Sequence, residues 1–221
     1  MRSILEDEAL VENREPQSQH VELQHINLKL LLKVSGNLDL DPIIPILHGW
    51  IQNQVFDELL LDVADYRHVP NGPGVVLIGH EADYSIDNTD GRLGVRYNRK
   101  AWVDGNNQDR LEQATRAVLH AAKRLEEDAS LQQKLRFNGR DIELSINDRL
   151  LAPNCEDTRK AIEPDFRMFF GRLFVGDQYS LSYSSDATKD CRRLFGASVC
   201  SRKVFSLTEL LENLRLAPHT Y

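Results

Sequence analysis

Cysteine is scarce in this chain of 221 residues, and its three copies follow no recognised pattern. Cys155, Cys191 and Cys200 are an odd number and contain no C-x-x-C pair, so the sequence predicts neither a disulfide framework nor a zinc ribbon. No window approaches the roughly 20 apolar residues of a membrane helix, and the first residues lack the apolar core of a signal peptide. We therefore expect reduced thiols, a cytoplasmic location and no membrane partner.

A stripe of basic residues is also missing. The formal net charge is −7, and most lysines and arginines alternate with acids along this acidic chain. A nucleic-acid binder needs such a stripe to displace counterions from phosphates, so we expect no nucleic-acid partner. The glycine motifs of phosphate loops and dinucleotide sites, the G-x-S-x-G elbow and H-E-x-x-H are absent as well. The sequence therefore favours a non-catalytic interaction or ligand-binding protein, whose partner is a protein or a small molecule.

Hydrophobic periodicity indicates the fold class. Residues 1–20 are polar and acidic and are predicted to form a mobile tail. Residues 21–130 and residues 131–221 each show the order strand, helix, strands, helix. We predict an α+β protein with antiparallel sheet and helices packed on one face, in two halves of ferredoxin-like element order. The two halves are either separate lobes or parts of one continuous sheet, and a homodimer through a sheet edge is compatible with either arrangement.

Alternation assigns the faces of the first strands. In INLKLLLKV, which starts at Ile26, the aliphatic residues point to the core and Lys29 points to solvent. In ELLLDVADY, Leu59, Leu61 and Val63 are expected to point inward. Between these strands a helix is predicted, with Asp41 as its N-terminal cap.

The next segment, GVVLIGHEADYSID (residues 74–87), alternates along its whole length and is predicted to be one strand. The face that carries the apolar residues of this strand also carries His80 and Tyr84. We therefore expect His80 to lie in the core beside Tyr84, as a hydrogen-bonded residue with a structural role. Residues 88–91 then form the turn of a hairpin. In the second half, a long helical pattern is expected to restart at Pro164.

A loop rich in proline and glycine precedes that strand, and it is the first candidate for binding. Two prolines stiffen DYRHVPNGPG and its two glycines can adopt positive φ angles, and loops on a rigid frame often carry function. The same composition also suits an ordinary strand connection. The candidate binding residues of this loop are Asp65, Tyr66, Arg67 and His68.

A polar face of the first sheet is the second candidate. Taking the apolar residues as inward, the outward side chains include Asp62, Glu81, Asp83 and Arg96. Such a mixture is typical of a solvated sheet face. Its alternative is a site in which Asp62, Glu81 and Asp83 hold a divalent cation or supply a general base, as in a metal-assisted hydrolase or an acid–base enzyme. No other cofactor is predicted.

Three segments of the chain resemble a conserved bacterial family with members in cyanobacteria among others. These segments are HGWIQ at residues 48–52, DVADYRHVPNGPGVVLIGHEADYSID at residues 62–87 and GRLGVRYNRK at residues 91–100. The resemblance covers about residues 48–100. It implies a bacterial cytoplasmic protein and carries no activity, cofactor or catalytic residue.

Overall fold

The computed structural model describes residues 21–33, 39–131, 135–183 and 193–215. The predicted tail at residues 1–20 lies outside this part of the chain. Strands and α-helices follow one another in the order β1 (Ile26–Leu32), α1 (Ile43–Gln52), β2 (Leu60–Tyr66), β3 (Gly74–Gly79), β4 (Ala82–Asp87), β5 (Gly94–Arg99), α2 (Asn107–Glu127), β6 (Phe137–Ile146), α3 (Glu156–Leu173), β7 (Tyr179–Tyr183), β8 (Phe195–Ser201) and α4 (Leu207–Asn213). Two short 3-10 turns, η1 (Thr89–Gly91) and η2 (Ala129–Leu131), complete the list.

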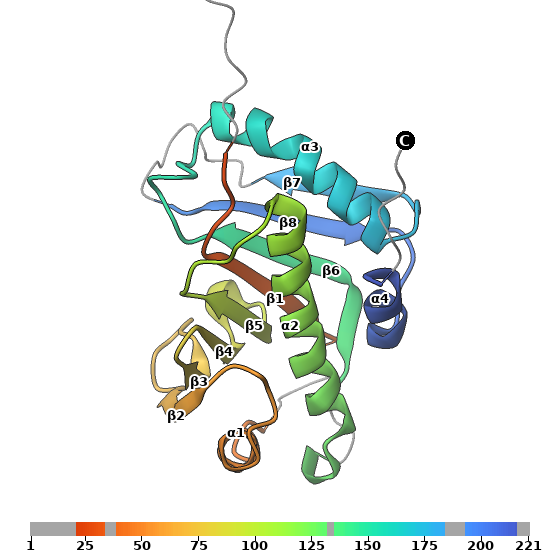
Figure 1. The fold of residues 1–221 in the computed structure, drawn as a ribbon. Coiled ribbons are helices and arrows are strands. Elements are labelled where there is room, and N and C mark those ends of the chain that lie inside the picture. Colours follow the sequence, from red (N-terminus) through yellow and green to blue (C-terminus); the bar gives the residue numbers. More distant parts are fainter. Residues whose placement is uncertain (1–20, 34–38, 132–134, 184–192, 216–221) are drawn as a thin grey trace, which may run out of the picture.

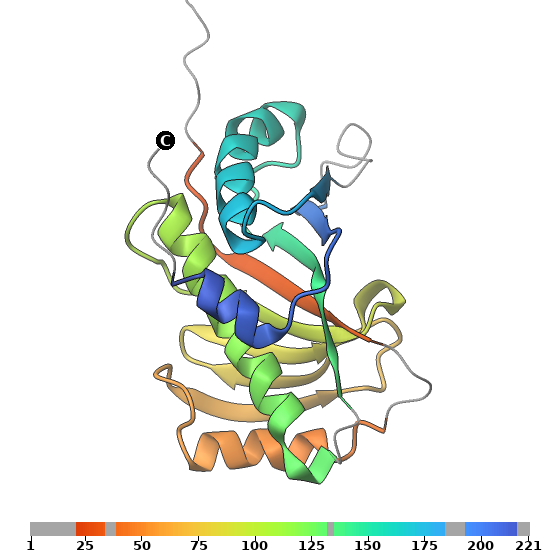
Figure 2. The same ribbon diagram turned by 90° about the vertical axis from the view of Figure 1, so that its right-hand side faces the viewer.

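All eight strands belong to one antiparallel sheet, in the order β2-β3-β4-β5-β1-β6-β8-β7. The two halves of the sequence meet where β1 pairs with β6, so the sheet is continuous across them. The helices pack on one face of this sheet, and α2 crosses its centre over β1 and β5 (Figures 1 and 2). The predicted α+β class, with antiparallel strands and helices on one face, is confirmed.

The central helix α2 is specified locally by its first turn. The Asn106 side chain accepts hydrogen bonds from the backbone N–H groups of Gln108 and Asp109, at 2.8 and 3.1 Å. The Asp109 carboxylate accepts one in return from the Asn106 N–H, which completes a capping box. One face of the helix is buried on the sheet, and the opposite face carries charged residues that border a cleft.

The segment at residues 74–87 does not form one strand, and the predicted position of His80 is wrong. The chain turns at His80 and Glu81, and β3 and β4 pair with each other on either side of this turn. His80 is exposed there, while its N–H donates to the Leu59 carbonyl at 2.8 Å. The two-residue turn exchanges the faces of odd and even positions, because Leu77 pairs with Tyr84 and Ile78 with Asp83. The buried set therefore changes from Val75 and Leu77 in β3 to Ala82, Tyr84 and Ile86 in β4, and one alternation cannot describe both strands. The hairpin turn expected at residues 88–91 does connect β4 to β5.

The prediction that Leu59 and Leu61 point inward is also wrong. Each is 51% exposed, and Leu60 between them is buried. The register of β2 against β3 shifts between Leu60 and Asp62, which marks a bulge. An extra residue in one strand reverses the faces of the residues beyond it, so alternation read from the sequence assigned the wrong set.

Lys29 was predicted to face solvent, yet it is buried. β1 lies in the middle of the sheet, and every one of its residues is buried. The Lys29 ammonium lies 2.6 Å from an Asp87 carboxylate oxygen, and both side chains are only 1% exposed. Asp87 also accepts hydrogen bonds from the N–H and the hydroxyl of Thr89, which begins η1. The turn after β4 thus folds against the face that the helices leave open.

Two helix predictions need correction. Helix α1 has Pro42 at its N-terminal cap position, and Asp41 instead forms an ion pair with Arg67 at the end of β2. Helix α3 does not restart at Pro164 but runs through it without a break. The missing N–H of Pro164 is tolerated because this helix buries a row of large side chains against the sheet. These are Ile162, Phe166, Phe169, Phe170 and Leu173. In the part of the chain that the structure describes, no helix is long and apolar enough to span a bilayer.

Candidate functional site

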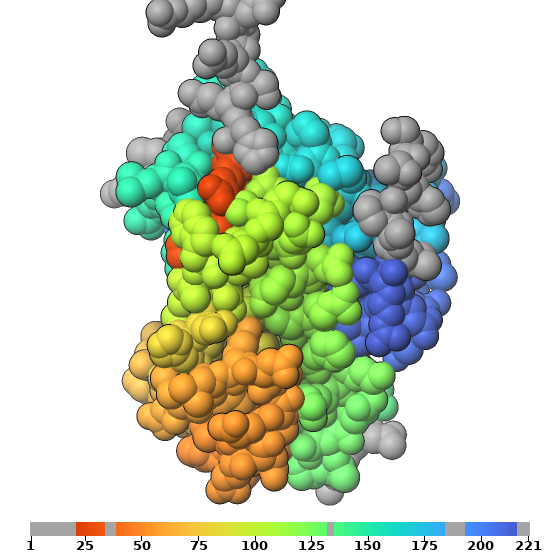
Figure 3. Space-filling view, viewed as in Figure 1, coloured from red at the N-terminus to blue at the C-terminus, as the bar shows by residue number. Residues whose placement is uncertain are grey.

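A cleft of about 700 Å³ opens between helix α2, the segment that follows α1, and the sheet at β4 and β5. This volume is within the range of small-molecule sites, about 300–1,000 Å³. The segment after α1 borders α2 on the face shown in Figure 3. The lining residues come from these three elements: Val55, Phe56, Asp57, Glu58, Glu81, Tyr84, Arg99, Asp109, Glu112, Gln113, Arg116, Ala117, His120 and Arg124.

Aromatic packing fixes the segment after α1. The Phe56 ring stacks on the Tyr84 ring of β4, with centroids 4.7 Å apart and planes 11° apart. Trp50, in the last turn of α1, meets Phe56 edge to face at 5.3 Å. The Arg124 guanidinium lies over Phe56, 5.7 Å from its centroid, and donates to the Val55 carbonyl at 3.1 Å. These contacts hold residues 55–58 between α2 and the sheet, which is how Glu58 reaches the cleft.

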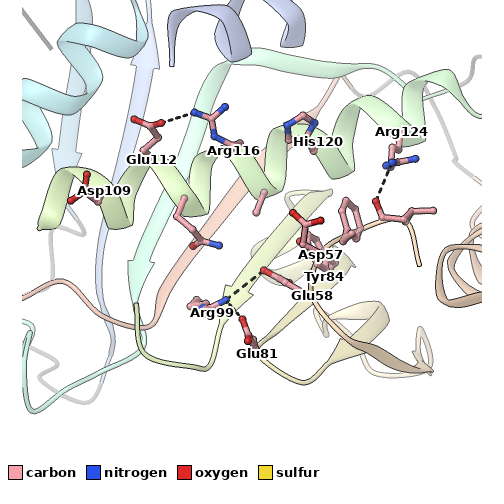
Figure 4. A pocket seen from close by; sticks show the side chains of 14 residues that line it. Asp57, Glu58, Glu81, Tyr84, Arg99, Asp109, Glu112, Arg116, His120 and Arg124 are labelled. Atoms are coloured by element: carbon pink, nitrogen blue, oxygen red, sulfur yellow. Dashed lines mark hydrogen bonds and ion pairs between the residues drawn. The ribbon is translucent and has the colours of Figure 1, made fainter. Parts of the chain in front are cut away.

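Glu58 is the centre of a hydrogen-bonded network. Its Oε1 atom accepts from the Tyr97 hydroxyl at 2.9 Å, and that hydroxyl accepts from Gln113 Nε2 at 2.8 Å. Arg99 lies 3.5 Å from the same Oε1 and 3.0 Å from Glu81 (Figure 4). The other carboxylate oxygen, Oε2, is buried and has no hydrogen-bond partner among the described residues. The network therefore leaves one buried acceptor without a hydrogen bond of good geometry within the described ranges, although the Tyr84 hydroxyl lies close enough to the Glu58 carboxylate to lower its pKa.

Burial governs the acidity of this network. The Glu58 side chain is 13% exposed, and this desolvation raises its pKa above the ordinary value of 4.5. The hydrogen bond from Tyr97 and the charge of Arg99 oppose the rise without cancelling it. Burial and the nearby Glu58 carboxylate also raise the pKa values of Tyr84 and Tyr97, so both phenols keep their protons. The base of the cleft combines one unusually weak acid with two neutral hydroxyls.

Two arginines and a histidine form the rim on α2. Arg116, His120 and Arg124 follow each other at intervals of four residues and so lie along one side of the helix (Figure 4). Desolvation lowers the pKa of His120, and the charges of Arg116 and Arg124 add to this effect. Glu112 balances part of this charge, because it accepts from Arg116 at 2.5 Å and from Arg172 of α3 at 3.0 Å.

The polar face predicted from the sequence is divided between two places. Glu81 lies in the turn between β3 and β4 and lines the cleft through its ion pair with Arg99. Asp62, Asp83 and Arg96 lie on the opposite, open face of the sheet.

Local bonds account for each of these three side chains. Asp62 bonds to the N–H of Val63 at 2.8 Å, Asp83 pairs with Lys100 at 2.7 Å, and Arg96 lies 3.3 Å from Asp87. Asp62, Glu81 and Asp83 do not converge, and nowhere in the described residues do three His, Cys, Asp or Glu side chains gather closely enough to hold a metal ion.

The candidate loop residues engage mainly with one another. Both Asp65 carboxylate oxygens accept from the Arg67 guanidinium, at 2.9 and 2.8 Å, and the Arg67 N–H adds a third bond at 3.0 Å. These bonds lower the pKa of Asp65 to about 2. The rings of Tyr66 and His68 lie 6.4 Å apart. Arg67 also pairs with Asp41, so this loop ties the end of β2 to the start of α1.

Sequence reasoning missed the main residues of the cleft. Glu58, Tyr97 and Gln113 come from three elements that are far apart in the sequence, and no motif joins them. A partial signal existed, because Arg116, His120 and Arg124 recur at helical spacing on one flank of a helix that the sequence predicts clearly.

The chain matches no protein-family model, no curated protein and no solved structure.

Because the pKa of Glu58 is raised, we expect the folding stability of the protein to depend on pH. An acid whose pKa is higher in the folded state binds more protons when folded, so folding stability should fall as the pH rises above 4.5. Glu58→Gln keeps a neutral side chain at every pH and removes this loss. We expect the stability of the variant, relative to the native protein, to increase between pH 4.5 and pH 8. Urea unfolding at several pH values measures this difference, and parallel pH profiles of the two proteins would contradict the raised pKa.

Proposed function

We propose that the protein is a non-catalytic binding protein and that its cleft holds a small aromatic or heterocyclic anion. The observation that carries the proposal is the open Oε2 atom of Glu58, a buried acceptor without a partner in the described part of the chain. A buried acceptor left unpaired costs about 1–3 kcal/mol, so a ligand that donates an N–H or O–H group to it gains that energy back. Glu58 therefore favours a ligand that carries an N–H or O–H donor.

The rest of the cleft supports a ligand that is both planar and negatively charged. The stacked pair of Phe56 and Tyr84 provides an aromatic wall next to Glu58. Arg116 and Arg124 provide positive charge at the rim, which favours a carboxylate or phosphate group there. A planar molecule with a donor at one end and an anionic group at the other would meet both the base of the cleft and its rim.

One observation also favours a second function, an acid–base enzyme. Glu58 has a raised pKa in a cleft and lies in one network with a second carboxylate, Glu81, through Arg99. A carboxyl group whose pKa approaches the working pH is suited to general acid catalysis. Under this alternative the reacting carboxylates are Glu58 and Glu81 in place of the metal-binding set considered from the sequence.

Thermal melts with a defined set of compounds test the proposal. The set contains the common nucleoside monophosphates, 4-aminobenzoate and indole-3-carboxylate, each with an anionic group and a planar N–H donor. A compound at 100 times its Kd stabilises the folded state by about 2.7 kcal/mol, which is an easily measured shift. Failure of every compound to shift the melt at millimolar concentration would reject the cleft as a site for this class.

Two variants of α2 then locate the site. Arg116→Gln removes a rim charge that lines the cleft, and Lys123→Gln removes an equal charge from the same helix outside it. Binding should weaken about tenfold in the first variant and remain unchanged in the second. Equal weakening in both variants would show that the ligand responds only to net charge. The enzyme alternative would be established if the native protein chemically converts a bound compound and the Glu58→Gln variant still binds that compound without converting it.

A protein partner or a second copy of the chain at a sheet edge stays a prediction. The edge strand β2 does carry exposed apolar side chains, with Leu61 51% and Tyr66 42% exposed. Sedimentation of the purified protein measures the oligomeric state directly.

A further inference from the structure

The face of the sheet that the helices leave open carries ordered rows of polar side chains. In Figure 2 the loop around η1 lies on this side of the sheet, away from α2. The strand registers place one row across seven strands in the order Asp62, Ile78, Asp83, Asn98, Asn27, Ser145 and Gly196. The adjacent row runs through Ser85, Arg96, Lys29, Glu143, Ser198 and Ser182. Polar groups thus meet at the centre of the sheet, where β1 is flanked by β5 and β6.

Two amide side chains at this centre lack hydrogen bonds that burial normally demands. Asn27 of β1 and Asn98 of β5 are directly opposite each other in the register. Asn27 is only 8% exposed. The Oδ1 atoms of both residues are buried without a hydrogen-bond partner in the part of the chain that the structure describes. Buried polar side chains nearly always have a partner, so two neighbouring acceptors without one indicate a missing donor.

A cavity of about 320 Å³ adjoins Asn27. Asn27 and Ser145 contribute to its wall, and so do the cationic side chains Lys29, Arg92 and Arg96. Lys29 and Arg96 share the buried Asp87 carboxylate, and Arg92 forms an ion pair with Glu143. The cavity is at the lower end of the volumes of small-molecule sites, so it suits a compound of few atoms.

The charges around the cavity determine which kind of hydrogen-bond donor a ligand can place next to Asn27. The cavity wall carries two carboxylates, Asp90 and Glu143, against four cationic side chains. This excess of positive charge at short range disfavours an ammonium or a metal cation at Asn27. A neutral donor, such as a hydroxyl or an amide N–H, meets no such penalty. The exposed fractions of the Arg92 and Arg96 side chains, 47% and 27%, leave both guanidinium groups able to reach an anionic group on the same molecule.

We infer that the open face of the sheet holds a second binding site, in which Asn27 accepts a hydrogen bond from a small hydroxylated anion and Arg92 and Arg96 bind its carboxylate or phosphate. The site is separate from the cleft under α2, because the sheet itself lies between them.

Stability of the free protein gives the first test. Asn27→Leu replaces an unpaired amide by an apolar group of similar size, so it should raise the melting temperature by about 2 °C. The control is Asn107→Leu, because the buried Asn107 side chain accepts from the Leu23 N–H at 2.8 Å and donates to the Val21 carbonyl at 2.9 Å. That substitution should lower the melting temperature by about 4 °C. A similar loss in Asn27→Leu would mean that its amide is structurally bonded, and would overturn the inference.

Ligand binding gives the second test. Calorimetry with D-gluconate, which has hydroxyls and a carboxylate, should show binding to the native protein. Sorbitol lacks the anion and acetate lacks the hydroxyls, so each should bind at least about tenfold more weakly. Asn27→Leu should weaken gluconate binding by about tenfold or more, and Arg116→Gln in the other cleft should leave it unchanged. No gluconate binding, or equal binding in Asn27→Leu, overturns the proposed ligand class.

Discussion

Replacing Lys29 with methionine should lower the free energy of unfolding by about 3–5 kcal/mol. Methionine fills a similar volume but leaves the Asp87 carboxylate, which is 1% exposed, without its closest cation. Arg96 at 3.3 Å and the two bonds from Thr89 compensate only in part. A buried charge that loses its partner bears the full cost of desolvation, which exceeds the net value of the pair. Urea unfolding at pH 7 measures the loss.

A matched control breaks an exposed ion pair on the same face. Lys100→Met removes the partner of Asp83, whose distance of 2.7 Å is similar, but these side chains are 38% and 21% exposed. Water solvates the remaining charge there, so the expected loss is about 0–1 kcal/mol. The double variant Lys29→Met with Asp87→Leu should recover much of the loss, because no unpaired charge remains. A cost below about 1 kcal/mol for Lys29→Met alone would show that the remaining bonds satisfy Asp87.

Phe170→Ala is the second substitution with a large expected effect. The ring is fully buried on the inner face of α3 and lies against Phe169 and Phe174, at centroid distances of 5.2 and 6.2 Å. Removing a buried phenylalanine ring costs about 3–5 kcal/mol, because the neighbouring rings collapse only partly into the space. The same helix offers Met168, which is 54% exposed, and Met168→Ala should cost less than about 0.5 kcal/mol. A cost for Phe170→Ala as small as that of Met168→Ala would mean that α3 packs loosely.

The sequence predicts the fold class well because local periodicity is strong in this chain. The helix at residues 107–127 and the final helix, with its capping box from Ser206 to Glu209, are found where their patterns indicate. The faces of strands were harder to predict. Alternation reports which residues share a face, but a bulge at Leu60 and a turn at His80 change the assignment without changing the composition.

Lys29 shows a different limit of sequence reasoning. Its alternation with leucines was read correctly, and it does lie on the face opposite the helices. It is nevertheless buried, because Asp87 and the η1 turn reach it from a strand 58 residues away. The same long-range assembly explains why Glu81 could be recognised as a candidate while Glu58 could not. Glu58 stands outside regular structure, and its neighbours Tyr97 and Gln113 are brought to it only by the packing of α2.

The central position of β1 also determines when the protein can fold. β1 leaves the ribosome before every other strand that the structure describes, yet its partner β6 ends at Ile146, more than a hundred residues later. At a synthesis rate of about 5–20 residues per second, the newly made β1 waits several seconds for that partner. During this interval a strand of leucines presents unpaired backbone groups on one side, which is the kind of segment that recruits other chains into aggregates. A fragment that ends before β6 keeps this exposed strand permanently, so the first half should need the second for its solubility.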